Sequence, residues 1–458
     1  MHTMKKAKKH ILLLAALILG MLTFAACAKE EPQQETNGPA KAISTEDLKG
    51  KLEDDSYVIV DTRINDAFNG WKLDGVSRGG HIEGAVDFSA NWLKVEAKDK
   101  DKVLDEALKT KGISLDKNIV LYDANGKDAL EVANYLSEKG YKNLYTYDVK
   151  EWAKDNSLPM VKYDNYQMIV PASAVKDIVD GKTPESFEAG KKVKIVEASW
   201  GEEDTSYAKG HVPTAFHINT DLIEPPPAWM LASDEQLTQF AKDYGFTKND
   251  TVIVTSEAQM AAYRVALVLR YMGVEDVRVL NGGLGAWTSA GYDVETASNK
   301  PTPVSDFGAV IPANPDLVDT MEETKAGLAT PDKFTLVDNR TWEEHIGKTS
   351  GYSYHDKMGR IPGAVYGYAG LGDSNSLQYY RNIDNTMRNA DEIAAMWKEA
   401  GIDTNKHLSF HCGSGWRVAE ILVYANTMGL DNVSIYSNGW IEWSNNPSNP
   451  IETGEPAK

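Results

Sequence analysis

The sequence is poor in cysteine, in positive charge and in long hydrophobic runs, and each shortage excludes a class of protein. It has 458 residues, two cysteines and a formal net charge of −19. A surface that acidic argues against nucleic acid or anionic lipid as a partner. No metal-ligand spacing and no nucleotide-binding glycine pattern is present, so we expect neither a metal nor a cofactor. The most apolar run, residues 11–24, is short for a membrane-spanning helix.

That apolar run has the setting of an export signal. Four lysines precede it, and the small residues Ala25 and Ala26 lead from it to Cys27. The arrangement resembles a bacterial lipoprotein signal, which implies that residues 1–26 are removed and that Cys27 becomes the lipidated first residue. Phe24 stands where leucine is usual, so plain secretion and a retained anchor stay open as alternatives. We expect an extracytoplasmic protein that is lipid-anchored to the bacterial cell membrane or periplasmic, with residues 27–42 as a linker.

Loss of such a signal affects both the charge and the cysteines. Residues 1–26 hold four lysines and no acidic residue, so their removal changes the net charge from −19 to −23. If Cys27 is acylated, Cys412 has no partner for an internal disulfide, although an exported location would permit one. A lone thiol kept outside the cytoplasm is more consistent with a reactive group than with a structural one.

One pattern recurs three times along the chain, whose length also indicates about three domains. Each copy has a β-rich strand that ends in a polar residue, a Gly-His or Gly-Arg turn, and a strand followed by a helix. The strands lie at residues 58–63, 194–199 and 335–340, and the turns at 80–85, 210–215 and 359–364. Alternating strands and helices predict α/β units with largely parallel sheets. We expect domains at residues 43–160, 168–298 and 310–450.

The segment from Leu408 to Arg417 carries the clearest chemical signal. Apolar and small residues lead into Cys412, two glycines follow, and helical periodicity begins after Arg417. Such a loop places the sulfur over backbone N–H groups and the positive end of a helix, which favours thiolate over thiol. Arg417 is expected to add a positive charge at the rim. A buried core cysteine is the alternative, but the glycines, the arginine and the helix start together favour a nucleophile beside an anion site.

The spacing within this loop indicates the type of chemistry. Four residues separate Cys412 from Arg417, whereas cysteine phosphatases use a loop one residue longer to wrap phosphate. The loop resembles the active-site loop of the rhodanese family of sulfurtransferases. This resemblance covers about residues 43–450 and implies three rhodanese domains in tandem. Its first four residues, Cys412-Gly413-Ser414-Gly415, are similar to the 3-mercaptopyruvate sulfurtransferases, and its arginine is more similar to thiosulfate-using members.

The three copies differ at the position of the nucleophile. Counting 17 residues back from the glycine after each helix gives Asp123, Ser256 and Cys412, and the position five residues further on holds Asp128, Ala261 and Arg417. Neither a carboxylate nor a hydroxyl can carry a sulfane sulfur as a persulfide. We therefore expect the first two domains to be inactive and the third to be catalytic.

The resemblance implies a two-step sulfur transfer. Cys412 would attack the outer sulfur of thiosulfate or 3-mercaptopyruvate, and the persulfide would pass its sulfur to cyanide or a thiol. The N–H groups of residues Gly413, Ser414, Gly415 and Trp416, with the Arg417 guanidinium, are expected to stabilise the leaving anion. A persulfide carrier or sulfur-sensing binding protein without turnover is the alternative. A phosphatase or arsenate reductase is disfavoured by the loop length.

Several other side chains have an assigned role and a competing one. Arg340 matches the arginine that contacts the donor carboxylate in mercaptopyruvate enzymes, or it forms a structural ion pair with Asp338. Trp416 closes the pocket or packs at its rim, and His411 is expected to point away from the cysteine into the core. The proline-rich segment at residues 225–230 is more consistent with a stiff surface excursion than with an interaction loop. The sequence leaves the donor, the acceptor and the oligomeric state open.

Overall fold

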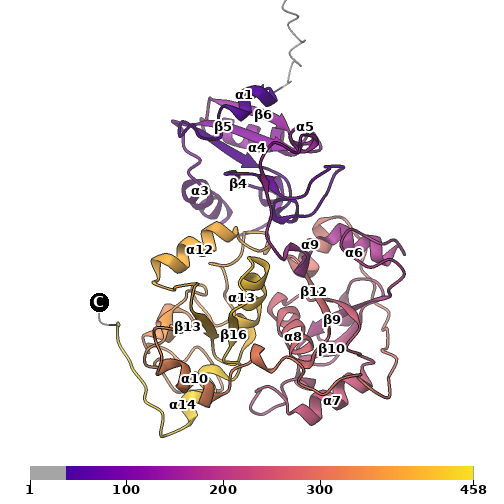
Figure 1. Ribbon diagram of the computed structural model, residues 1–458, viewed down its shortest axis with the longest axis vertical. Coiled ribbons are helices and arrows are strands. Elements are labelled where there is room, and N and C mark those ends of the chain that lie inside the picture. The colour runs from indigo at the N-terminus through magenta and orange to yellow at the C-terminus, as the bar shows by residue number, and fades with distance from the viewer. Residues whose placement is uncertain (1–37, 457–458) are drawn as a thin grey trace, which may run out of the picture. The chain divides into compact units, whose positions relative to one another are not determined.

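The computed structural model describes residues 38–456, which form three α/β units, each with a parallel sheet and flanking helices (Figure 1). The expected fold class is confirmed. In the first unit the strand order is β1-β6-β5-β2-β4, and every pair is parallel. These strands are β1 (Lys41–Ala42), β2 (Tyr57–Asp61), β4 (Val86–Asp87), β5 (Asn118–Asp123) and β6 (Leu144–Asp148). Its helices are α1 (Thr45–Lys49), α2 (Asn65–Asn69), α3 (Lys100–Thr110), α4 (Asp128–Glu138) and α5 (Val149–Lys154).

The second unit repeats this arrangement with the strand order β10-β9-β11-β12-β8. Its strands are β8 (Ile169–Val170), β9 (Val193–Ser199), β10 (Phe216–Asn219), β11 (Thr251–Thr255) and β12 (Asp276–Leu280). Its helices are α6 (Ala172–Val179), α7 (Asp234–Asp243), α8 (Gln259–Met272) and α9 (Gly283–Ser289). A short antiparallel pair, β3 (His81–Ile82) with β7 (Met160–Val161), lies where the chain leaves the first unit.

The third unit has a four-stranded sheet in the order β14-β13-β15-β16. Its strands are β13 (Phe334–Asp338), β14 (Val365–Tyr366), β15 (His407–His411) and β16 (Val433–Ile435). Its helices are α10 (Met321–Leu328), α11 (Trp342–His345), α12 (Ala390–Glu399), α13 (Trp416–Thr427) and α14 (Gly439–Asn445). Short 3-10 turns complete the chain at Ala90–Lys94, Tyr166–Met168, Tyr207–Lys209, Thr220–Leu222 and Pro315–Leu317.

The glycine after each long helix has the backbone geometry that the repeat implies. Gly140, Gly273 and Gly429 have φ values of 93°, 113° and 92°. This left-handed region suits glycine, which lacks the Cβ that would clash there. Each helix therefore ends at the same point of its unit, and the count that aligns Asp123, Ser256 and Cys412 places all three at the end of a central strand.

Hydrophobic packing joins the second and third units. Helices α8 and α13 pack against each other, and one continuous core includes buried residues of both units, such as Val254, Ala266, Phe410 and Ile421. The first unit has hydrophobic clusters of its own. The start of α13 therefore lies beside the second unit.

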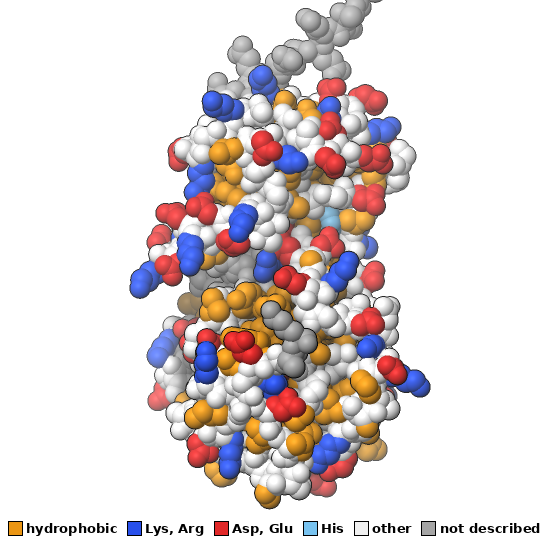
Figure 2. Space-filling view, turned by 90° about the vertical axis from the view of Figure 1, so that its left-hand side faces the viewer, with side chains coloured by type: hydrophobic (Ala, Val, Ile, Leu, Met, Phe, Trp, Pro, Cys, Tyr) orange, Lys and Arg blue, Asp and Glu red, His pale blue; other side chains and the backbone are white. Residues whose placement is uncertain are grey.

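Two features of the described residues bear on partners. No helix in residues 38–456 is long and apolar enough to span a bilayer, and no three His, Cys, Asp or Glu side chains of that range are grouped to hold a metal ion. The apolar run at residues 11–24 and Cys27 lie outside this range. Acidic and basic side chains are interspersed on the face drawn in Figure 2.

Candidate active site

Strand pairing brings the predicted site residues to one edge of the third sheet. β13 and β15 are parallel, with Asp338 opposite His411. Cys412 follows one strand directly and Arg340 follows the other by two residues. Ligands of open α/β sheets bind outside the carboxyl ends of the strands, which is where these two side chains lie.

The loop after β15 encloses the sulfur of Cys412. The Gly415 N–H donates to Sγ at 3.3 Å, and Gly415 has a φ of 97° at the start of α13. From the other side, N–H groups of α14 bind two loop carbonyls, Trp440 to Cys412 at 2.9 Å and Ile441 to Gly413 at 3.2 Å. These carbonyls are held away from the sulfur, so an amide faces it instead. Cys412 is 2% exposed.

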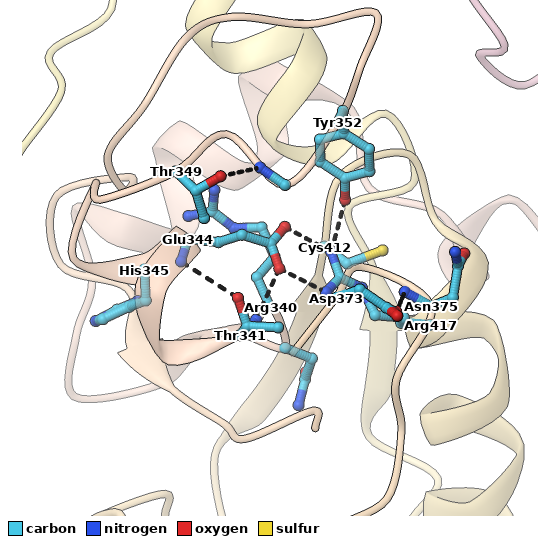
Figure 3. Close-up of polar contacts among 12 residues, drawn as sticks. Arg340, Thr341, Glu344, His345, Thr349, Tyr352, Asp373, Asn375, Cys412 and Arg417 are labelled. Carbon is cyan, nitrogen blue, oxygen red and sulfur yellow. Dashed lines mark hydrogen bonds and ion pairs between the residues drawn. The ribbon is translucent and has the colours of Figure 1, made fainter. Parts of the chain in front are cut away.

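Arg417 does not lie at an open rim, because its side chain turns inward and is 1% exposed. Its guanidinium donates to both carboxylate oxygens of Glu344, at 2.8 and 3.0 Å, and to the Tyr352 hydroxyl at 2.6 Å (Figure 3). Burial alone would raise the pKa of the Glu344 carboxyl, but Arg417, together with Arg340 and the Thr341 N–H, outweighs burial and holds that pKa below its usual value. Arg417 also interacts electrostatically with Cys412.

Two tyrosines lie against the loop. A Cβ at Gly413 would come within 1.9 Å of the Tyr352 hydroxyl, so this glycine is needed for the close approach. Burial raises the pKa of Tyr352 well above its ordinary value, and the phenol therefore keeps its proton at neutral pH. Tyr354 lies beside the half-buried Ser414, and burial raises its pKa as well.

Arg340 is bound within its own strand end. It donates to both carboxylate oxygens of Asp338, at 2.8 and 2.7 Å, and to the Gly359 carbonyl at 2.9 Å. Its guanidinium also lies 4.6 Å from the centre of the Trp440 ring. The ion pair is thus present, and Nη1 is buried without a hydrogen-bond partner among the described residues. Contact with a donor stays a prediction.

His411 is a buried core residue, as strand alternation predicts. Its Nε2 lies 3.8 Å from Asp338, and burial lowers its pKa to about 4, so the ring is neutral at physiological pH. A neutral ring turned toward Asp338 is not placed to shuttle protons at Cys412.

The second unit contributes side chains that the sequence did not point to. Glu224 accepts from the Trp416 indole N–H and, at 3.0 Å, from Arg264 Nε. Burial raises the pKa of Glu224 to about 7, although Arg264 opposes this shift. Trp229 packs on Tyr354 with ring centres 5.3 Å apart. Pro226 and Pro227 are exposed, as a surface excursion predicts, but Trp229 of the same segment reaches the third unit.

The equivalent loops of the first two units are closed. In the first, Asp123 accepts from the backbone N–H groups of Gly126 at 3.1 Å and Ala129 at 3.0 Å. The carboxylate of Asp123 therefore occupies the loop N–H groups that would otherwise face a ligand. In the second, Ser256 is fully buried and its hydroxyl has no hydrogen-bond partner among residues 38–456. The positions equivalent to Arg417 hold Asp128 in the first unit and Ala261 in the second, so neither loop is followed by that arginine.

Little in the sequence could have identified the partners of Arg417 and Trp416. Thr341 and Glu344 form a capping box, which is a readable helix-start signal, but that signal does not say that the glutamate also binds Arg417. Glu224 and Arg264 belong to the second copy and reach the site only through the packing of α8 on α13.

Comparison with known proteins identifies the three units. The model of the rhodanese-like domain matches residues 44–155, 172–290 and 320–446. The thiosulfate sulfurtransferase YnjE of Escherichia coli K12 is 38% identical over 408 residues, which cover 88% of this chain and 91% of that protein. The human 3-mercaptopyruvate sulfurtransferase is 24% identical over 267 residues, covering 56% of this chain and 86% of its own.

Solved structures extend the likeness to nearly the whole described chain. The anaerobic ergothioneine biosynthesis enzyme of Chlorobium limicola, in complex with trimethyl histidine, aligns with a TM-score of 0.85 and 34% identity over 91% of this chain and 100% of its own. A persulfide form of EanB with ergothioneine aligns equally well, at 35% identity, with the same coverage of both chains. With three rhodanese-like domains in one polypeptide, the chain belongs to the rhodanese family of sulfurtransferases.

Proposed function

We propose that the third domain transfers a sulfane sulfur from thiosulfate or 3-mercaptopyruvate through a persulfide on Cys412. The observation that carries the proposal is the Gly415 N–H on the Cys412 sulfur, with the buried Arg417 cation behind the same loop. An amide and a guanidinium favour the anionic forms of a thiol, a persulfide and a leaving group. Asp123 and Ser256 offer no sulfur atom, so the first two domains are inactive in this proposal.

The first step balances without an added oxidant. With thiosulfate, the Cys412 thiolate bonds to the outer sulfur, and the bond between the two sulfur atoms of thiosulfate breaks. Sulfite leaves with the electron pair. With 3-mercaptopyruvate, the carbon–sulfur bond breaks, and the pyruvate enolate that leaves takes up a proton. Loop amides from Gly413 to Trp416, together with Arg417 and Arg340, are proposed to bind these anions.

The second step passes the outer sulfur to cyanide or a thiol. An imidazole ring is a second candidate acceptor, because solved relatives carry trimethyl histidine or ergothioneine. The feature of this chain that favours it is the aromatic pair Trp229 and Tyr354 beside the loop, since such faces attract organic cations. A carrier that holds the persulfide without turnover stays the alternative to catalysis.

One experiment separates these functions. The protein is exposed to each donor, Cys412 is examined by peptide mass spectrometry for one added sulfur, and thiocyanate, sulfide and thiolated trimethyl histidine are measured with the three acceptors. We expect the persulfide and repeated turnover, both abolished in Cys412→Ser and retained in the control Ser256→Ala. A stable persulfide without turnover would support the carrier function instead of catalysis. Release of phosphate from a supplied phosphate ester, without any persulfide, would contradict sulfur transfer.

We also propose that the mature protein begins at Cys27, carries lipid there and lies outside the cytoplasm on the bacterial cell membrane. The charged, apolar and small-residue order of residues 1–27 supports this proposal. Mass spectrometry of the mature N-terminus measures it directly. An unmodified Cys27, or an N-terminus at another residue, would overturn it.

A further inference from the structure

A buried arginine of the second domain touches the catalytic loop. Arg264 lies on α8 and is fully buried. A Cβ added to Gly415 would come within 2.6 Å of its Nη1, so the guanidinium lies directly against the residue whose N–H binds the Cys412 sulfur. The same Nη1 donates to Ser437 Oγ at 3.0 Å, which ties the guanidinium to the segment preceding α14.

Arg264 is itself fixed by a second-domain carboxylate. Its Nε donates to Glu224 at 3.0 Å, and the other oxygen of Glu224 accepts from the Trp416 indole. Gly415 and Trp416 are the last residue of the loop and the first of α13. Both are therefore held by one buried ion pair from a domain that has no nucleophile of its own.

Each of the two domains places a buried charged side chain against the loop of the other, and the two charges are opposite. Arg264 follows Ser256 by eight residues, and Glu420 follows Cys412 by eight. Glu420 pairs with Arg381 and accepts from Gln259, which follows Ser256 as Gly415 follows Cys412. Each long helix thus places a buried charge against the other domain's loop. The loop with the cysteine receives a cation, and the loop with the serine receives a carboxylate.

We propose that Arg264, held by Glu224, is a positioning residue for sulfur transfer: it fixes Gly415 so that its N–H stays on the Cys412 sulfur in the thiolate and persulfide states. This inference rests on the proposed function of Cys412. It also assigns a task to the second domain, which supplies one wall of the active site while its own loop is inert. A displaced Gly415 would cost transition-state stabilisation more than donor affinity, because Arg340 and Arg417, which are proposed to bind the donor, are left unchanged in the third domain.

The test compares two buried ion pairs of one interface. Arg264→Met removes the pair beside Cys412, and Arg381→Met removes its counterpart beside Ser256. We expect Arg264→Met to lower kcat by up to about 100-fold with KM for the donor changed less than about twofold, as misplaced catalytic groups do. Arg264→Lys should restore part of kcat, because an ammonium can still bind Glu224. Arg381→Met should keep kcat within about twofold of the native value.

A second measurement keeps the result interpretable without turnover. The rate at which iodoacetamide alkylates Cys412, followed by peptide mass spectrometry of folded protein, should fall in Arg264→Met and stay native in Arg381→Met. Equal losses in both variants, or an unchanged kcat and alkylation rate in folded Arg264→Met, would overturn the inference. If the native protein shows no turnover with any donor, the proposed function fails, and the alkylation rates still decide the role of Arg264.

Discussion

At the scale of single residues, the first and third domains use the same amide for different groups. Gly126, three residues after Asp123, donates to that carboxylate, and Gly415, three residues after Cys412, donates to the sulfur. One loop geometry thus binds, through a backbone N–H, the side chain at the end of the strand in both domains. In the first domain the group that accepts from these amides is the Asp123 carboxyl, which is part of the chain and occupies the place that a substrate anion would take. The residue at the end of the strand therefore determines whether the loop N–H groups bind a side chain of the protein itself or form a candidate active site.

The buried Arg417 cation is paired with the Glu344 carboxylate, and the titration of that carboxylate gives a pH-dependent prediction. Glu344→Gln should lower the unfolding free energy at pH 7 by about 2 kcal/mol, since a charged hydrogen-bonded partner is lost in a buried place. Arg417 holds the pKa of Glu344 below its ordinary 4.5, so this stabilisation is present above that value and is lost as the pH falls through the lower, folded-state pKa. Denaturant unfolding between pH 7 and 3 measures both effects.

The neighbouring carboxylate is the control for that measurement. Glu343 precedes Glu344 and is exposed, so Glu343→Gln should change the unfolding free energy by less than about 0.5 kcal/mol at any of these pH values. A difference between native protein and Glu344→Gln that stays constant down to pH 3 would show that the carboxylate charge contributes nothing to the pair.

At the scale of elements, the loop that begins at Cys412 is supported by the start of α14. Gly439 has a φ of 47°, and a Cβ there would come within 2.4 Å of the Cys412 carbonyl oxygen. The second domain repeats this contact, because the Leu284 N–H of α9 donates to the Ser256 carbonyl at 3.0 Å. The glycine that begins each short helix is therefore part of the loop's geometry in both domains.

Gly439→Ala should disturb this support. The added methyl group meets a backbone oxygen that cannot move without shifting Cys412, so we expect a loss of more than about 2 kcal/mol of stability and a fall in sulfur transfer. Gly401→Ala is the matched control, since Gly401 has a φ of 78° with nothing near its Cβ and should show only the backbone cost of about 1–2 kcal/mol. Thermal unfolding and kcat measure the two variants, and equal effects would contradict the contact.

Sequence signals from neighbouring residues were sufficient to predict the helices, strands and loops. Contacts between residues far apart in the sequence could not be predicted from them. Helix-ending glycines, apolar strands and the loop that follows His411 are each indicated by neighbouring residues, so strand, loop and helix were predictable from the sequence and are confirmed. The burial of Arg417 was not, because Glu344 lies 73 residues away in sequence. The contact of Trp229 with Tyr354 was not predictable for the same reason, because it depends on how two domains pack.

At the scale of the whole described molecule, buried polar groups connect the first domain to the other two. Lys111 lies between Asp87 of its own domain and Glu392 of the third, with its Nζ 2.7 Å from Asp87. Asn281 of the second domain donates to Asp66 at 3.0 Å and accepts from the Met387 N–H of the third. A first domain that is joined through groups this well buried contributes to the architecture around the third domain.

Lys111→Met tests that connection. The Lys111 side chain is 2% exposed. Burial alone would raise the pKa of Asp87, but Lys111, together with hydrogen bonds from Asn389 and the backbone, holds that pKa below the usual value. Without it, two carboxylates face each other in a buried place, which should cost about 3–5 kcal/mol. We expect calorimetry to show a lower unfolding temperature, with the first domain unfolding as a separate, earlier transition. Lys139→Met removes a surface pair with Asp105 and should cost under about 1 kcal/mol. A single transition at the same temperature in both variants would show that Lys111 does not couple the domains.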